Sequence, residues 1–168
     1  MKDATFSGKP QPTSRMCFVC GRENPNGLHT QFYENHAEEQ IVAHVKIPDS
    51  YQGYPGIAHG GIVAAILDEV SGRAIMMDAD ETPFWVTAKL EIRYRDPTPT
   101  ETPLEAVGWV EERRRRSAQV AGEIRREDGT VTAEISAVVV KPSAAQLEAW
   151  GPWSQEATYW LVEEKESL

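Results

Sequence analysis

The sequence predicts an α+β fold in which an antiparallel sheet wraps around one long helix. Two patterns support this prediction. Residues 59–78 lack proline and repeat apolar side chains at helical spacing, whereas the stretches on either side alternate apolar and polar residues as strands do. The predicted order is two strands, the helix, four strands and a helical tail, and strands that follow one another directly favour antiparallel pairing. The length of 168 residues suits a single domain.

Charge and composition narrow the function classes. Acidic residues outnumber basic ones by 26 to 17, and the resulting net charge of −9 argues against nucleic acid as a partner. No apolar run reaches the roughly 18 residues of a membrane helix, and the first residues lack the apolar core of a signal peptide. Two cysteines are too few for a disulfide framework. We therefore expect a cytoplasmic protein with no nucleic-acid or membrane partner.

The part of the chain before the helix is expected to hold an arm, a hairpin and a loop. Residues 1–16 are polar and contain glycine and proline, which predicts a flexible N-terminal arm. Alternating residues over 28–32 and 41–47 predict two strands joined by a polar turn. Residues 48–58 contain two prolines and two glycines, which predicts a loop.

Four strands and a helical tail are expected after the helix. The strands are predicted over residues 82–97, 104–110, 117–125 and 130–141. Residues 142–168 are predicted to form tail helices that pack on the domain or on a neighbouring subunit, with Ser143 as a helix N-cap. Gly151 and Pro152 interrupt the helical pattern, which resumes over residues 153–161.

The apolar face of the predicted helix leaves Asp68 on another side, among small residues. Its neighbours on a helical wheel are Ala64, Ala65, Ser71 and Gly72. A carboxylate with such neighbours lies at the bottom of a groove that another molecule can approach, although most acidic side chains simply face water. At the edge of the helix, Glu69 and Arg73 are expected to form a solvated surface pair.

The start of the same helix offers backbone N–H groups to an anion. His59, Gly60 and Gly61 begin it, and glycines leave these N–H groups uncovered at the positive end of the helix dipole. Such a site can hold the oxyanion that develops on a carbonyl group. Because Asp68 lies nine residues after His59, we expect an oxyanion donor and a carboxylate base on one helix. A tight turn from loop to helix is the structural alternative for the two glycines.

Three motifs resemble one protein family over residues 17–141. HGGIVAAILDE begins at His59, TAKLEIRYRDP supplies the following strand, and CFVCGRENPNGL opens the stretch. Together they resemble the hotdog-fold acyl-CoA thioesterases of the PaaI-like group. The resemblance implies a bent antiparallel sheet around one central helix, with residues 17–141 as the hotdog domain. It also implies a homodimer or homotetramer with its active site at the dimer interface.

The resemblance further implies roles for single residues. Gly60 would donate its N–H to the thioester carbonyl oxygen, and Asp68 would activate water as a general base or attack as a nucleophile. Thr87 matches a hydroxyl residue on the partner subunit's strand that helps to place the water, and His59 would orient the thioester or support the loop. Some relatives carry Asn or Gln six residues before this histidine, where the present chain has Gly53.

Further residues are candidates for binding the substrate. The basic run at residues 113–116 suits the phosphates of coenzyme A because the arginine fork matches phosphate geometry, and a solvated strand end is the alternative. Four aromatic residues either line an acyl or aryl pocket or pack in the core, namely Tyr51, Tyr54, Phe84 and Trp85. The substrate-binding candidates are Gln52, Tyr54, Gly61, Arg93, Arg113, Arg114, Arg115 and Arg116.

The two cysteines raise the question of a metal. Cys17 and Cys20, together with His29 and His36, offer the donor types of a zinc site. A single CxxC with this histidine spacing matches no standard zinc finger, and the CxxC belongs to the family-like opening motif. We therefore expect no metal.

Hydrolysis of acyl-CoA or aryl-CoA thioesters to free acid and CoA is the function that the sequence favours. The reaction needs a water nucleophile, a base and stabilisation of the oxyanion, and it needs no cofactor because coenzyme A is part of the substrate. Two other classes stay open. One is a hotdog hydratase or dehydratase that acts on acyl thioesters, and the other is a non-catalytic acyl-CoA-binding module.

Overall fold

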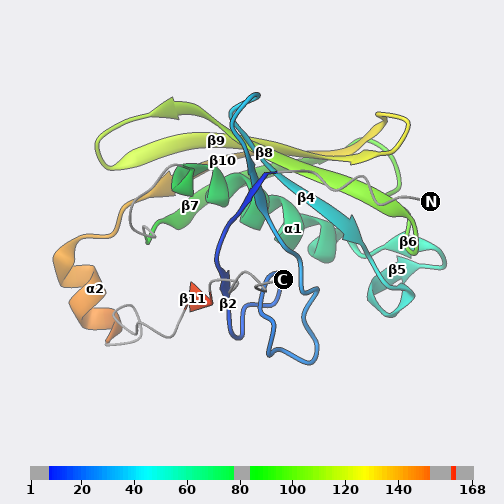
Figure 1. Ribbon diagram of the computed structural model, residues 1–168, viewed down its shortest axis with the longest axis horizontal. Helices are drawn as coiled ribbons and strands as arrows, with labels where there is room; N and C mark the ends of the chain where they lie inside the picture. The colour runs from blue at the N-terminus through cyan, green and yellow to red at the C-terminus, as the bar shows by residue number, and fades with distance from the viewer. Residues whose placement is uncertain (1–7, 78–83, 152–159, 162–168) are drawn as a thin grey trace, which may run out of the picture.

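An antiparallel sheet curves around a long helix in the computed structural model (Figure 1), as the sequence predicts. The structure describes residues 8–77, 84–151 and 160–161. The strand order is β1-β3-β4-β8-β9-β10-β7, and every neighbouring pair is antiparallel. The strands of this sheet are β1 (Lys9–Pro10), β3 (Tyr33–Asn35), β4 (Gln40–Lys46), β7 (Val86–Tyr94), β8 (Pro103–Arg113), β9 (Ser117–Arg126) and β10 (Val131–Val140).

The central helix α1 (Gly60–Arg73) continues into the 3-10 turn η2 (Ala74–Met76). Two small strand pairs flank the main sheet, β5 with β6 and β2 with β11. The other elements are β2 (Thr13–Ser14), η1 (Asp49–Tyr51), β5 (Gln52–Tyr54), β6 (Ile57–Ala58), α2 (Ala144–Trp150) and β11 (Trp160–Leu161). Over the ranges that the structure describes, no helix is long and apolar enough to cross a membrane.

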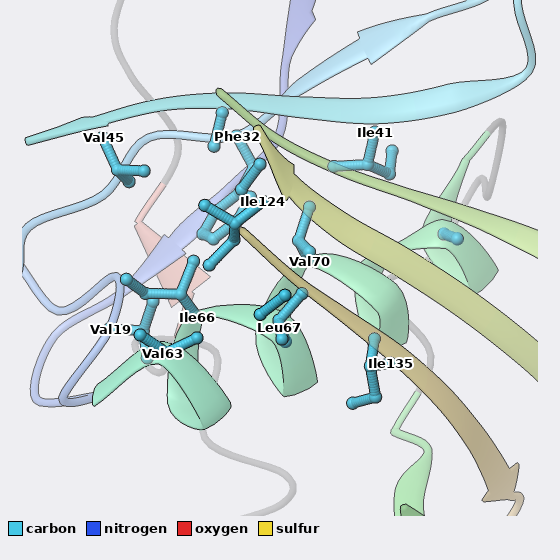
Figure 2. Close-up of a cluster of buried hydrophobic side chains, with 14 of the residues drawn as sticks. Val19, Phe32, Ile41, Val45, Val63, Ile66, Leu67, Val70, Ile124 and Ile135 are labelled. Carbon is cyan, nitrogen blue, oxygen red and sulfur yellow. The ribbon is translucent and has the colours of Figure 1, made fainter. Parts of the chain in front are cut away.

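The hydrophobic core lies between α1 and the inner face of the sheet (Figure 2). Apolar residues of α1 recur at helical spacing and are fully buried, namely Val63, Ile66, Leu67 and Val70. They meet inward-facing residues of the strands such as Ile41, Ile124 and Ile135, which are also buried. Burial of one such side chain stabilises the fold by about 1.5–3 kcal/mol.

Gly108 on β8 sets how closely the helix approaches the sheet. A Cβ atom at this position would lie 2.3 Å from the backbone oxygen of Val70, which is far inside van der Waals contact. Only glycine therefore lets α1 lie directly on β8 at this point. The close contact fixes the rotation of α1 about its axis. It therefore also fixes the direction of the helix face that points away from the core.

The first predicted strand is placed differently in the structure. Residues 28–32 are not a strand, because the N–H groups of Leu28 and Thr30 donate to the carbonyls of Phe18 and Val19 instead of to a sheet neighbour. His29 has a φ of 51°, which interrupts an extended backbone. The first strand of the hairpin is therefore β3, which pairs with β4.

The predicted flexible arm is wrong for the part of it that the structure describes. Strand β1 pairs with β3, and strand β2 pairs with β11. Thr13 and Ser14 are buried, and so is Gln11. The side chains and backbone of the segment form hydrogen bonds with other parts of the domain. Its polar composition therefore resembles that of a flexible arm although the segment is ordered. We call residues 11–24 the leader segment.

The tail is helical only in part. Ser143 caps α2 as predicted, with a complete capping box that includes Gln146. None of the α2 residues is buried, so this helix does not pack on the sheet. The second predicted tail helix is wrong at Trp160 and Leu161, which form β11, and residues 152–159 lie outside the described ranges. The tail contacts the domain through the pairing of β11 with β2.

Candidate active site

The N-terminus of α1 is shaped by His59, which is the N-cap of the helix. The Gly61 N–H donates to Nδ1 of His59 at 2.9 Å, and the His59 N–H donates to the carbonyl of Tyr51 at 2.9 Å. The hydroxyl of Tyr94 donates to the carbonyl of Gly60 at 2.7 Å. His59 therefore supports the loop and the helix start. Because its cap uses the Gly61 N–H, Gly60 carries the glycine N–H that the cap leaves available.

Asp68 lies on the side of α1 that faces away from the core, where it meets strand β7. The Thr87 hydroxyl donates to Oδ1 of Asp68 at 2.8 Å. Partial burial raises the pKa of the Asp68 carboxyl, the hydrogen bond from Thr87 opposes that shift, and Glu69 adds to it. A carboxylate that has a raised pKa and a hydroxyl neighbour is a suitable general base near neutral pH.

A cavity of about 260 Å³ opens beside this pair. Its polar wall consists of Ser14, Cys17, Cys20, Asp68, Glu69, Arg73 and Thr87. Its apolar wall consists of Ile75, Met76, Phe84, Trp85, Val86 and Val139. Gly72 also lines the cavity, and a Cβ atom there would meet nothing within 4 Å. The small residue beside Asp68 thus leaves open space, as the helical wheel predicts.

Gly60 and Asp68 of one chain are too far apart to act on one carbonyl group. They lie eight residues apart on α1, and a helix rises about 1.5 Å per residue, so about 12 Å separates their positions along the axis. Both groups lie on one helix as the sequence predicts, but within one chain they cannot act together on one carbonyl group. The structure also corrects the position of Thr87, which belongs to the same chain as the carboxylate that it contacts.

Glu69 and Arg73 form a buried ion pair and not the surface pair that the sequence suggests. Nε of Arg73 donates to Oε1 of Glu69 at 2.8 Å, and the side-chain exposures are 3% and 24%. The guanidinium also donates to the carbonyl of Pro12 at 2.9 Å and stacks over the ring of Phe32. Burial raises the pKa of Glu69, and the nearby Arg73 opposes that shift. The leader segment covers this pair, which periodicity within α1 alone does not reveal.

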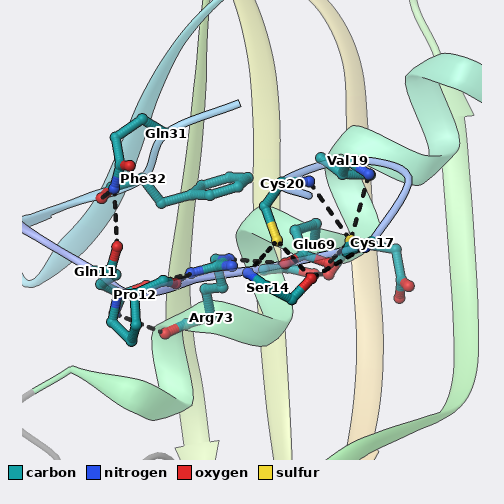
Figure 3. A network of polar contacts seen from close by, with 12 residues as sticks. Gln11, Pro12, Ser14, Cys17, Val19, Cys20, Gln31, Phe32, Glu69 and Arg73 are labelled. Atoms are coloured by element: carbon teal, nitrogen blue, oxygen red, sulfur yellow. Dashed lines mark hydrogen bonds and ion pairs between the residues drawn. The ribbon is translucent and has the colours of Figure 1, made fainter. Parts of the chain in front are cut away.

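Cys17 and Cys20 come to lie beside Glu69 (Figure 3). The pKa of the Cys20 thiol is lowered to about 5, because Cys17 donates a hydrogen bond to it and Arg73 lies nearby. The same hydrogen bond and burial raise the pKa of Cys17. The two histidines considered with these cysteines lie elsewhere: His29 bonds to the backbone, and His36 contacts Glu34. Both cysteines line the cavity. In the sequence, the CxxC motif is the feature that singles out these two residues.

The remaining candidates fall into two groups. Gln52 and Tyr54 are exposed in strand β5, which pairs with β6 within the segment predicted as a loop, and Oε1 of Gln52 accepts the Gly56 N–H. Arg93 lies in a separate groove over β7 to β10, away from the cavity that holds Asp68.

The four consecutive arginines also differ from one another. The guanidinium of Arg113 lies 5.9 Å from the ring centre of Trp85, which lines the cavity. Arg114 is paired with Glu112 instead. Arg115 and Arg116 lie in the turn between β8 and β9, where the Arg116 carbonyl accepts the Lys141 N–H. Arg113 is thus the member of the run with a described contact to the cavity lining.

The four aromatic candidates separate in the same way. Phe84 and Trp85 line the cavity. Tyr51 packs edge-on against Phe18 beside the core, and Tyr54 is 74% exposed. The aromatic wall of the cavity therefore comes from the segment before β7, and the loop before α1 does not contribute to it.

Comparison with known proteins agrees with this geometry. The family model of the thioesterase superfamily matches residues 55–133, which include the helix start, Asp68 and Thr87. Over these residues the chain is similar to the thioesterase superfamily. A crystal structure of a thioesterase superfamily protein shares 31% sequence identity with the chain and superposes with a TM-score of 0.68. The match covers 76% of the present chain and 61% of that protein. The curved sheet around α1 is accordingly the hotdog fold that the motifs imply.

Two further matches carry names that mention coenzyme A. The acyl-coenzyme A thioesterase THEM4 of Rattus norvegicus is 30% identical over 97 residues, which cover 58% of this chain and 40% of that protein. A thioesterase structure with coenzyme A from Streptococcus pneumoniae has a TM-score of 0.57 at 20% identity, and the match covers 62% of this chain and 79% of that one. The chain thus spans about two fifths of the length of its curated relative.

Proposed function

We propose that the protein hydrolyses acyl-CoA or aryl-CoA thioesters to the free acid and CoA. The observation that carries the proposal is the 2.8 Å hydrogen bond between Thr87 and Asp68 at the wall of the cavity. Asp68 takes a proton from a water molecule that the Thr87 hydroxyl helps to place. The water oxygen then adds to the thioester carbonyl carbon, and the C–S bond breaks as CoA leaves as its thiol.

General-base catalysis suits this site better than direct attack by the carboxylate. The Thr87 hydroxyl occupies one oxygen of Asp68 and leaves the other free to accept a proton from water. The raised pKa of Asp68 increases its basicity as an acceptor of a proton from water. No cofactor takes part in this scheme.

The oxyanion donor in this proposal is Gly60 of a second copy of the chain. Because about 12 Å separates Gly60 from Asp68 along α1, a complete site combines Asp68 and Thr87 of one subunit with the helix start of another. Strand β7 is the open edge of the main sheet, and most of its residues are exposed, including Leu90 and Tyr94. An edge strand of this kind suits pairing between subunits, so we propose a homodimer or a homotetramer.

The substrate class rests on the relatives and on the cavity lining. THEM4 is named an acyl-coenzyme A thioesterase, and the Streptococcus pneumoniae structure holds coenzyme A. Ile75, Met76, Phe84 and Trp85 offer an apolar and aromatic surface to an acyl or aryl group. The HGG motif and the opening motif favour the PaaI-like group, and a cytoplasmic location accords with a CoA-ester substrate.

Free-thiol release across a panel of acyl- and aryl-CoA esters tests the proposal. Hydrolysis is expected for at least one ester class, and the panel ranks the acyl groups. A change in the enoyl chromophore without thiol release would instead indicate the hydratase or dehydratase class. Binding of CoA esters without turnover would indicate a non-catalytic binding module, and either result would contradict the proposal.

Replacing Thr87 by valine is expected to move the acidic limb of the pH profile to higher pH. The Thr87 hydrogen bond lowers the pKa of Asp68, so its loss leaves burial unopposed and raises that pKa further. Because only the ionised carboxylate acts as the base, less of it is then available at acidic pH. The rate is expected to fall about tenfold at neutral pH, which is what one hydrogen bond to a charged group contributes. A profile of kcat/KM against pH that keeps its acidic limb would contradict this role.

Replacing Arg113 by glutamine is expected to raise KM for CoA esters about tenfold with little change in kcat, because a charge-assisted contact to phosphate is lost. Arg113 is chosen because it lies over Trp85 at the cavity. Arg114→Gln is the matched control, since Arg114 pairs with Glu112. Simple thioesters without the phosphates of CoA should show no such effect. If both variants raise KM equally, the effect comes from the overall surface charge and not from a specific contact between Arg113 and the substrate.

A further inference from the structure

We propose that Cys17, Cys20 and Glu69 form a binding site for a zinc-type divalent metal ion, which joins the leader segment to α1. One donor atom from each of these residues lies within 4.8 Å of the other two. Thiolates and carboxylates are established zinc ligands. The site differs from the one considered from the sequence, because Glu69 takes the place of the two histidines.

The spacing of the donor atoms already approaches that of a tetrahedral site. Sγ of Cys17 lies 3.8 Å from Oε2 of Glu69. Bond lengths of about 2.3 Å to sulfur and about 2.0 Å to oxygen place two such ligands about 3.5 Å apart around tetrahedral zinc. The three side chains converge from the leader segment and from α1 (Figure 3). Binding would therefore require only small side-chain adjustments.

The backbone around the cysteines is shaped to support thiolates. The N–H groups of Val19 and Cys20 lie 3.3 and 3.5 Å from Sγ of Cys17, and the Ser14 N–H lies 3.5 Å from Sγ of Cys20. N–H donors of this kind orient metal-bound sulfur and stabilise its charge. A Cβ atom on Gly21 would lie 2.3 Å from the Cys17 carbonyl oxygen, so the turn after the second cysteine requires glycine.

Arg73 completes the charge balance of the proposed site. Two thiolates and the Glu69 carboxylate carry three negative charges, which one divalent cation and the Arg73 guanidinium would neutralise. Arg73 bonds to Oε1 of Glu69, whereas Oε2 faces Cys17. The two oxygens of the carboxylate thus serve different partners. Arg73 would act as an outer-shell residue that holds the metal-binding oxygen in place.

The proposed ion would have a positioning effect and no step in the hydrolysis. Glu69 follows Asp68 directly in α1, so a metal on Glu69 would fix the helical turn that carries the base. All three ligands line the cavity, and water from the cavity can supply a fourth ligand. The metal would also fix one wall of the cavity by holding the leader segment in place.

Titration of the reduced, chelator-treated full chain with Co²⁺ tests the proposal. We expect binding of one ion per chain with a thiolate-to-cobalt charge-transfer absorption, displacement by Zn²⁺, and a metal-dependent rise in Tm. Cys17→Ser should fold, since Cys17 is half-buried and tolerates a small polar residue. It should lower the charge-transfer absorption by at least about half, because it removes one of the two thiolate ligands. Glu69→Gln should weaken affinity by at least the roughly 10–100-fold that loss of an outer-shell partner costs.

His36→Ala is the matched control because His36 lies beside Glu34, outside the proposed site, and it should bind Co²⁺ as the wild type does. Absence of the charge-transfer absorption in the folded wild type would overturn the proposal, and so would absorption of unchanged strength in Cys17→Ser. Circular dichroism verifies that each variant is folded. A chain that binds no Co²⁺ is then treated with oxidised glutathione. If Cys17 and Cys20 form a disulfide while the glutathione is reduced to two thiols, the pair is a redox couple and the metal site is excluded.

Discussion

Replacing Asp68 by asparagine is expected to lower the rate of CoA-ester hydrolysis by about 10²–10⁴-fold, which is the usual contribution of a general base. Asparagine has almost the same shape and keeps a carbonyl oxygen that accepts the Thr87 hydrogen bond. It cannot take a proton from water. Because Asp68 lies outside the hydrophobic core, the variant should fold. The measurement is single-substrate kinetics by thiol release, with substrate affinity measured separately.

Asp96→Asn provides the matched control. Asp96 has the same chemistry but pairs with Arg126 on the surface, away from the cavity, so its replacement should leave the rate unchanged. Turnover of Asp68→Asn close to the wild-type rate would remove Asp68 from the mechanism. The fold assignment would still stand, since it rests on the sheet and on the family match.

Replacing Gly60 by proline is expected to lower kcat by about 10²–10³-fold, as loss of an oxyanion-hole donor does. Gly60 is the first residue of α1, where proline is well tolerated because its fixed φ suits the helix start. His59 before it has φ −61° and ψ 134°, a conformation that proline allows in the preceding residue. The substitution therefore removes one N–H with little other change.

Gly60→Ala separates the loss of the N–H from steric effects. Both variants add a Cβ atom that would lie 3.3 Å from the Tyr94 hydroxyl, so both require the same small shift of that side chain. Only the proline variant lacks the N–H. Equal rates for the two variants would show that the N–H of Gly60 is not the oxyanion donor.

A mixture of the two inactive variants tests whether the active site is shared between subunits. If Asp68 of one copy works with Gly60 of another, a dimer of Asp68→Asn with Gly60→Pro contains one intact site. Random reassociation of equal amounts makes half of the dimers mixed, so about a quarter of the wild-type activity should return. If Asp68 and Gly60 of the same chain formed the active site, no activity would return in the mixture.

The sequence predicts the centre of the fold well because the patterns there are local. A proline-free run with helical spacing predicts α1, and the small residues around Asp68 predict the open space beside it. The four strands after α1, β7 to β10, are rich in branched and aromatic residues and follow one another in the predicted order. The HGG motif marks the helix start through the conformational freedom of glycine, whose effect is likewise local.

Features that depend on distant parts of the chain could not be predicted from these patterns. Glu69 and Arg73 look like a surface pair until the leader segment covers them. The leader segment itself is polar because Gln11 and Ser14 bond within the domain. The HGG motif and Asp68 show that both groups are present in the helix. The distance between Gly60 and Asp68 follows only from the helix rise, which the motif does not display. Contacts with no local periodicity leave no trace in a single sequence.

The attachment of the leader segment also bears on how the domain fluctuates. Arg73 bonds to Pro12 and Gln11, which lie 61 and 62 residues away in the chain. Contacts that close such long loops form against an entropic cost, and the two-residue strand β2 on this segment adds few backbone hydrogen bonds. Segments of this kind exchange their amide hydrogens through local opening while the rest of the molecule stays folded. We therefore expect the cavity wall formed by the leader segment to open locally without global unfolding, which amide hydrogen exchange of that segment would measure.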